Sequence, residues 1–93
     1  MIICVGSVFL DHIVKINSFP KKPIKVLAQG IEKRLGGSAA VASFTIKKLG
    51  INTSFIGRLG NDDASKFLKN ELKKFKIKHN NIFEIKGVKS SQS

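Results

Sequence analysis

The sequence has a single cysteine, Cys4, and no tryptophan or tyrosine. One cysteine cannot form an internal disulfide, which favours a reducing, cytoplasmic location. Long apolar runs are also missing, whereas a membrane-spanning helix needs about 20 apolar residues. A secretory leader is not expected, because Met1 is followed by no basic region and Gly6 interrupts the first apolar stretch. With 42% hydrophobic and 25% charged residues, the composition is that of a globular domain and excludes disordered and collagen-like chains.

Acidic residues are few: six Asp and Glu stand against 17 Lys and Arg, which gives a net charge of +11. Such an excess is compatible with nucleic acid or another polyanion as a partner. However, only two of the basic residues, Arg34 and Arg58, are arginines, although proteins that read phosphates and bases favour the planar arginine fork. We therefore prefer a solvated, lysine-coated exterior. A small basic, non-catalytic module that binds nucleic acid or another polyanion stays as the alternative.

Strand-like and helix-like segments alternate along the chain. Short apolar or alternating runs predict a buried strand at 2–9, half-exposed strands at 13–16 and 24–34, and buried strands at 53–57 and 82–85. This alternation predicts an α/β fold with a mostly parallel sheet flanked by helices. Because a parallel sheet is normally covered on both faces and only two strong helices are visible, we expect the chain to be the N-terminal part of a longer protein.

Two helices are expected. The first follows the Gly-Gly pair at 36–37 and ends at the glycine in position 50, with Ala42, Ile46 and Leu49 on its buried face. The second opens at Asn61-Asp62-Asp63, and we interpret the acidic pair Asp62-Asp63 as a helix cap in preference to a cation site. Its apolar positions keep helical spacing at Ala64, Phe67, Leu68, Leu72 and Phe75.

Two features could bind a ligand. The turn Gly36-Gly37-Ser38 precedes a helix, and such a turn can hold a phosphate, a carboxylate or sugar hydroxyls; it can equally be a tight turn that serves helix packing. Asp11 follows the first strand, at the end where ligands collect in α/β sheets, and its carboxylate could accept two hydrogen bonds from adjacent hydroxyls or cap a loop. The two histidines and one cysteine show no metal-ligand spacing.

The glycine-rich tract and its surroundings resemble the first signature of the ribokinase/PfkB family of carbohydrate kinases. The tract at 36–43 is followed at fixed spacing by Gly50 and Gly60, and 55–63 is similar to the family's FIGRVGDD segment. Val5-Gly6-Ser7 and Asp11 resemble the family's opening strand and substrate-binding aspartate.

This resemblance implies a ribokinase-like fold, with a central sheet flanked by helices and a small β lid built from segments of about 13–18 and 24–34. Residues 1–93 would be the N-terminal part of one kinase domain. The sugar would lie between lid and sheet, touched by residues corresponding to Asp11, Gly36, Gly37 and Ser38, and a homodimer would form through the lid. Lys25 on the lid could meet an anionic end of the substrate.

The reaction implied by the resemblance is transfer of the γ-phosphoryl group of ATP to a sugar hydroxyl, with Mg²⁺. The family's catalytic base is an Asp in a Gly-x-Gly-Asp motif, which residues 1–93 do not contain. The catalytic and ATP-binding segments are therefore expected outside this segment, which by itself would be inactive. Val41 stands where the family usually has Asn. The Gly-Gly-x-Ala-Ala tract, Lys25 and the residues at 89–93 are similar to a branch that includes sulfofructose kinase.

Overall fold

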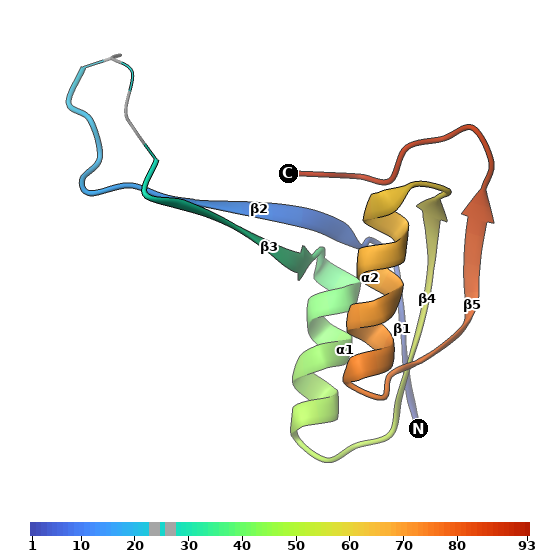
Figure 1. Ribbon diagram of the computed structural model, residues 1–93. Helices are drawn as coiled ribbons and strands as arrows, with labels where there is room; N and C mark the ends of the chain where they lie inside the picture. The colour runs from blue at the N-terminus through green and yellow to red at the C-terminus, as the bar shows by residue number, and fades with distance from the viewer. Residues whose placement is uncertain (23–24, 26–27) are drawn as a thin grey trace.

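The computed structural model describes residues 1–22, 25 and 28–93. Its elements follow the chain in the order β1 (Ile2–Val5), β2 (Phe9–Lys15), β3 (Gly30–Gly36), α1 (Ser38–Lys48), β4 (Thr53–Gly60), α2 (Asp63–Lys74) and β5 (Lys78–Ile85). Three strands form a parallel sheet in the order β1-β4-β5, and β2 pairs with β3 in a separate antiparallel sheet. Figure 1 shows this second sheet extending away from the helices. The predicted α/β fold with a mostly parallel sheet and a small β lid is confirmed.

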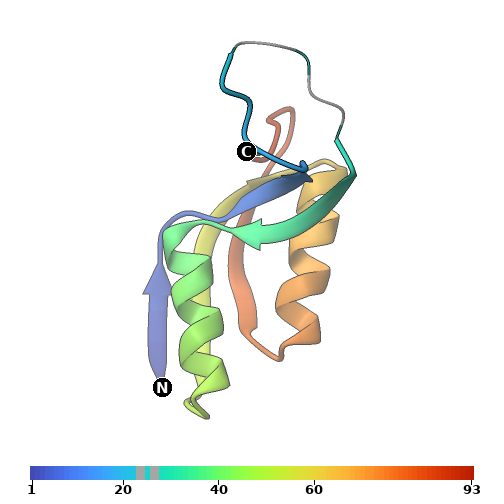
Figure 2. The ribbon, with the colours of Figure 1, turned by 90° about the vertical axis from the view of Figure 1, so that its left-hand side faces the viewer.

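Both helices lie on the same face of the three-stranded sheet, α1 against β1 and β4, and α2 against β4 and β5 (Figures 1 and 2). The opposite face is uncovered, so that Ile3, Val5 and Phe83 are 55%, 69% and 61% exposed. The prediction of a buried strand at 2–9 is therefore wrong: the strand ends at Val5, and three of its four residues are exposed. An apolar strand becomes buried only where something covers both of its faces.

The core lies between the sheet and the helices. Its central strand is β4, whose Phe55 is fully buried, and α2 contributes the predicted apolar face. The largest buried apolar side chains are Leu10, Phe55, Leu59, Leu68, Leu72 and Ile77. On the rim, Lys69 of α2 forms an ion pair with Glu84 of β5. Neither helix among the described residues is both long enough and apolar enough to cross a membrane.

Helix α1 presents a different face to the sheet from the one predicted. Its buried residues are Ala39, Ala40 and Ser43, while Ala42 is exposed and Leu49 is 72% exposed. Here α1 approaches the sheet so closely that a Cβ built at Gly6 would lie 3.1 Å from the Cβ of Ala39. Only small side chains fit at this distance, so packing overrides the larger apolar residues that suggested the other face.

The two lid strands are displaced from the predicted segments. The prediction placed them at 13–18 and 24–34, whereas β2 runs over Phe9–Lys15 and β3 over Gly30–Gly36. Of the predicted segments, residues 24, 26 and 27 lie outside the described residues. The ladder pairs Phe9 with Gly36, so it reaches the glycine turn itself. These limits are set by pairing between residues that are distant in the sequence. The local alternation of apolar and polar residues does not indicate which residues pair.

Candidate functional site

The structure brings Asp11 and Gly36 together on one face of the β2–β3 sheet. Gly36 pairs with Phe9 in the antiparallel ladder, and Asp11 lies two residues further along β2. The carboxylate of Asp11 lies so close to Gly36 that a Cβ built there would come within 2.5 Å of its Cγ. A side chain at position 36 would therefore displace the carboxylate, because the carboxylate occupies the space of a Cβ. The sequence predicted both residues as site candidates, and their contact is a tertiary feature.

Gly37 joins this site to helix α1, with its backbone at φ 95° and ψ 141°. A Cβ at this position would lie 2.6 Å from the carbonyl oxygen of Ser7. As the N-cap of α1, Gly37 has no side chain to accept a bond from the first helical amides. Ser7 replaces it from 31 residues away: its Oγ accepts the Ser38 N–H at 3.2 Å, and its carbonyl accepts the Ala40 N–H at 3.2 Å.

Ser7 is a residue that the site prediction missed, although it belongs to the Val5-Gly6-Ser7 run. Its Oγ lies 3.2 Å from the Oγ of Ser38, so the predicted Ser38 is in contact with it. Ser7 also lines a depression of about 440 Å³ at the carboxyl end of β1 and beside the middle of β4, together with Arg58 and Phe83. Ligands bind at this end of parallel strands in open α/β sheets. One signal in the sequence could have indicated Ser7. Gly37, at the start of α1, has no side chain that could accept a hydrogen bond, so another segment must cap the helix.

The charges around Asp11 leave its carboxylate without an ion pair among the described residues. Arg34 stands opposite Asp11 in the ladder, but its guanidinium donates to both carboxylate oxygens of Glu32, each at 3.1 Å. These hydrogen bonds hold the pKa of Glu32 below its usual range. The Asp11 carboxylate therefore remains a hydrogen-bond acceptor beside the backbone at 36–37, an arrangement suited to a ligand that carries hydroxyl groups.

Two other predicted features lie apart from this group. Lys25 is exposed in the connection between β2 and β3, and it has no ion-pair partner within the part of the chain that the structure describes. Val41 is 47% exposed and lines a different depression, between β3 and the two helices. The structure does not bring Lys25 to Asp11.

Comparison with known proteins identifies the fold and the signature together. The model of the pfkB family of carbohydrate kinases matches residues 1–91. The chain belongs to this family. The resemblance of the glycine tract and of 55–63 to the PfkB signature is thereby confirmed.

Individual relatives agree with this assignment. A nucleoside kinase of Methanocaldococcus jannaschii is 34% identical over a 73-residue alignment that covers 74% of this chain and 24% of that protein. The crystal structure of a nucleoside kinase from the same organism, described as an archaeal member of the ribokinase family, has a TM-score of 0.77 at 27% identity, covering 98% of this chain and 30% of that one. Arabidopsis thaliana ribokinase, solved with ribose and ATP, has a TM-score of 0.79 at 25% identity over 98% of this chain and 30% of its own. The PfkB chain described here thus spans less than a third of the length of these relatives.

Neither a cluster of metal ligands nor the family's Gly-x-Gly-Asp motif is found in the described residues of this PfkB chain. Among the residues that the structure describes, no three His, Cys, Asp or Glu side chains are grouped to hold a metal ion. Asp62 caps α2 as predicted, since its side chain accepts from the Ser65 N–H in a capping box. The sequence also has no Gly-x-Gly-Asp motif. The aspartate that the resemblance implies as catalytic base is therefore not among residues 1–93.

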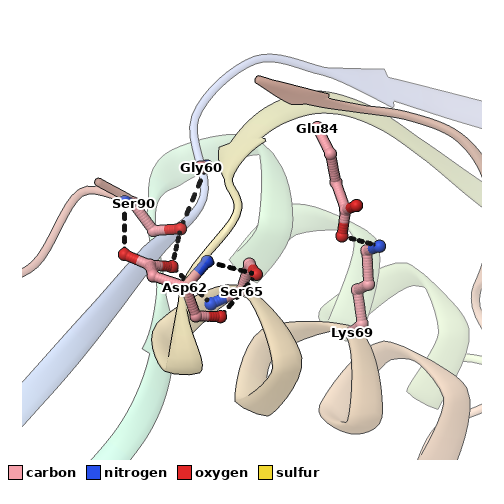
Figure 3. A network of polar contacts seen from close by, with 6 residues as sticks. All are labelled: Gly60, Asp62, Ser65, Lys69, Glu84 and Ser90. Carbon is pink, nitrogen blue, oxygen red and sulfur yellow. Dashed lines mark hydrogen bonds and ion pairs between the residues drawn. The ribbon is translucent and has the colours of Figure 1, made fainter. Parts of the chain in front are cut away.

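The loss of stability at acid pH is expected to depend on Asp62. The hydroxyl and the N–H of Ser90 both donate to its carboxylate, which holds the pKa of Asp62 below its usual value (Figure 3). A carboxyl whose pKa is lowered by folding stabilises the fold above its unfolded pKa, and this stabilisation is lost as the pH falls through the folded pKa. We expect Asp62→Asn to lower the melting temperature at pH 7 and to flatten its fall between about pH 5 and pH 3.

Melting curves of the wild type and of Asp62→Asn, recorded at pH 7 and between about pH 5 and pH 3, measure this effect. Asp63→Asn is the matched control, because Asp63 is exposed and only approaches Lys66 at 4.0 Å. An acid slope that Asp63→Asn flattens as much as Asp62→Asn does would contradict the assignment.

Proposed function

We propose that the complete protein containing this segment transfers the γ-phosphoryl group of ATP to a hydroxyl of a sugar or sugar derivative. Residues 1–93 would be the N-terminal part of its single kinase domain, supplying the lid strands β2 and β3 and part of the sugar site. The observation that carries this proposal is the Asp11 carboxylate, which lies against Gly36 just before α1 and has no ion-pair partner among the described residues. Family membership and the ribose and ATP bound to the Arabidopsis ribokinase support it.

Each site residue has a proposed part. Asp11 accepts hydrogen bonds from two neighbouring hydroxyls of the sugar, which orients the ring. The sugar contacts the backbone of Gly36 and Gly37 beside the Asp11 carboxylate, and Ser38 adds a hydroxyl at the start of α1. Lys25 meets an anionic end of the substrate, such as a phosphate or the sulfonate of a sulfofructose-like sugar. The base, ATP and Mg²⁺ sites belong to residues beyond this segment.

A homodimer through the lid is also proposed. Val14 and Ile31 pair across β2 and β3 and are 53% and 68% exposed, so they form an exposed apolar pair on one face of the lid. We expect Ile31→Lys to convert a dimer of the complete protein into monomers, because the change buries a charge in the interface. Sedimentation velocity measures the change, and Lys15→Ala, on the opposite face of the same two-stranded sheet, is the control. A wild type that sediments as a monomer would contradict this proposal.

The test of the function is ATP consumption by the purified complete gene product with a panel of sugars, polyols, nucleosides, sugar phosphates and a sulfonated sugar. We expect turnover with at least one acceptor that has adjacent hydroxyls. No turnover with any acceptor would refute the kinase proposal. The alternative, a polyanion-binding module, predicts retention on nucleic acid with a steep salt dependence, whereas the kinase predicts indifference at moderate salt. A cytoplasmic location follows from the proposed use of ATP and the free Cys4.

A further inference from the structure

A polar cluster ties the end of the chain to the start of α2. Ser90 is buried, with 6% of its surface exposed, and its N–H donates to Asp62 Oδ2 at 2.8 Å. Its hydroxyl donates to Asp62 Oδ1 at 2.7 Å and accepts the Gly60 N–H at 3.1 Å. Figure 3 shows Ser90 facing Asp62 and Gly60 at the carboxyl end of β4. Three hydrogen bonds therefore fix one residue of the segment that follows β5.

That segment runs directly from Ser90 along β2. Its bonds alternate with the residues of β2: the Leu10 N–H donates to the Ser91 carbonyl at 2.9 Å, the Ser93 N–H to the Leu10 carbonyl at 2.9 Å, and the His12 N–H to the Ser93 carbonyl at 2.7 Å. The pairing is parallel, with Gln92 opposite Leu10. Residues 91–93 thus occupy the edge of β2 that β3 leaves free.

The two β2 amides bound by this segment stand on either side of Asp11. On its other edge, β2 is held by β3, which carries Gly36 against the Asp11 carboxylate. A strand held on both edges keeps its side chains in one place, and a shift of one residue would turn Asp11 to the opposite face. Residues 91–93 directly follow Ser90, so the hydrogen bonds of Ser90 limit how far they can shift along β2.

We propose that Asp62 and Ser90 are positioning residues for Asp11, because their contact holds residues 91–93 along β2 and thereby keeps the Asp11 carboxylate in the sugar site. The inference rests on the proposed function for the role of Asp11. It gives Asp62 a second part besides capping α2: Asp62 supports substrate binding by keeping Asp11 in place.

The test compares Ser90→Ala with Ser65→Ala in the complete gene product. Both changes remove one hydroxyl from the same cluster, but the Ser65 hydroxyl bonds only the backbone of Asp62, donating to its carbonyl at 2.7 Å and accepting its N–H at 3.2 Å. We expect Ser90→Ala to raise the KM for the sugar acceptor about tenfold with little change in kcat. The same variant should speed amide hydrogen exchange at Leu10 and His12. Ser65→Ala should lower the melting temperature but leave the KM and the amide exchange at Leu10 and His12 unchanged. Ser90→Thr, which keeps the hydroxyl, should restore the wild-type KM and the wild-type exchange.

The outcomes separate the inference from the kinase proposal. Unchanged exchange at Leu10 and His12 in Ser90→Ala, or an equal increase in Ser65→Ala, would overturn the inference. Faster exchange with an unchanged KM would also overturn it, because β2 would then not control Asp11. If the wild type turns over no acceptor, the proposed function fails, and the exchange comparison still decides whether the cluster holds β2.

Discussion

Gly37→Ala is expected to destabilise the protein by more than about 3 kcal/mol. At φ 95° and ψ 141°, an alanine sits in a backbone region that costs about 1–3 kcal/mol by itself. In addition, its Cβ would lie 2.6 Å from the Ser7 carbonyl oxygen, which is backbone and cannot move aside. The start of α1 would shift, and Ser7 would lose its bonds to the first helical amides. Chemical denaturation of the complete protein measures the change in the free energy of unfolding.

Gly50→Ala separates the two causes. Gly50 also has a positive φ, of 85°, but a Cβ built there meets nothing within 4 Å. We therefore expect only the backbone strain, about 1–2 kcal/mol. If both variants lose the same stability, the contact with Ser7 contributes nothing, and the close approach of α1 to the first strand is not what requires glycine at position 37.

The largest functional effect is expected from Asp11→Asn. The amide keeps the size and shape of the side chain but replaces one acceptor oxygen by an NH₂ donor, so a hydroxyl pair can no longer donate to both ends. Because a hydrogen bond to a charged group contributes about 1.5–3 kcal/mol, we expect kcat/KM for the sugar acceptor to fall about 100-fold. Steady-state kinetics of the complete gene product measure the loss, with the melting temperature recorded alongside.

The matched control for this change is Asp63→Asn, which makes the same substitution at an exposed position in the first turn of α2. It should leave kcat/KM at the wild-type value. If Asp11→Asn keeps the wild-type kcat/KM, the sugar does not bind at Asp11, and the proposed site is wrong. Gly36→Ala gives independent support, since its methyl group would displace the Asp11 carboxylate and should reduce kcat/KM without changing any charge.

Comparison of the two helices shows where local pattern is sufficient. Helix α2 has apolar residues at regular helical spacing and the Asp62 cap, and its start and the burial of Ala64, Leu68 and Leu72 match the prediction. Helix α1 has small residues all along its first turns, so more than one face could be buried. The separation between helix and sheet selected Ala39, Ala40 and Ser43, and that separation depends on the residues of another segment.

The sequence by itself determined the fold class, the α2 helix, the buried strand β4 and the candidates Asp11, Gly36 and Gly37, because each leaves a signal within a few neighbouring residues. Only the tertiary structure decided the limits of the lid strands, the exposure of β1 and the contact of Asp11 with Gly36. It also decided the hydrogen bonds of Ser7 and Ser90, whose partners lie 31 and 28 residues away. Hydrogen bonds and packing between such distant segments depend on how the chain crosses in space, which local patterns of residues do not specify.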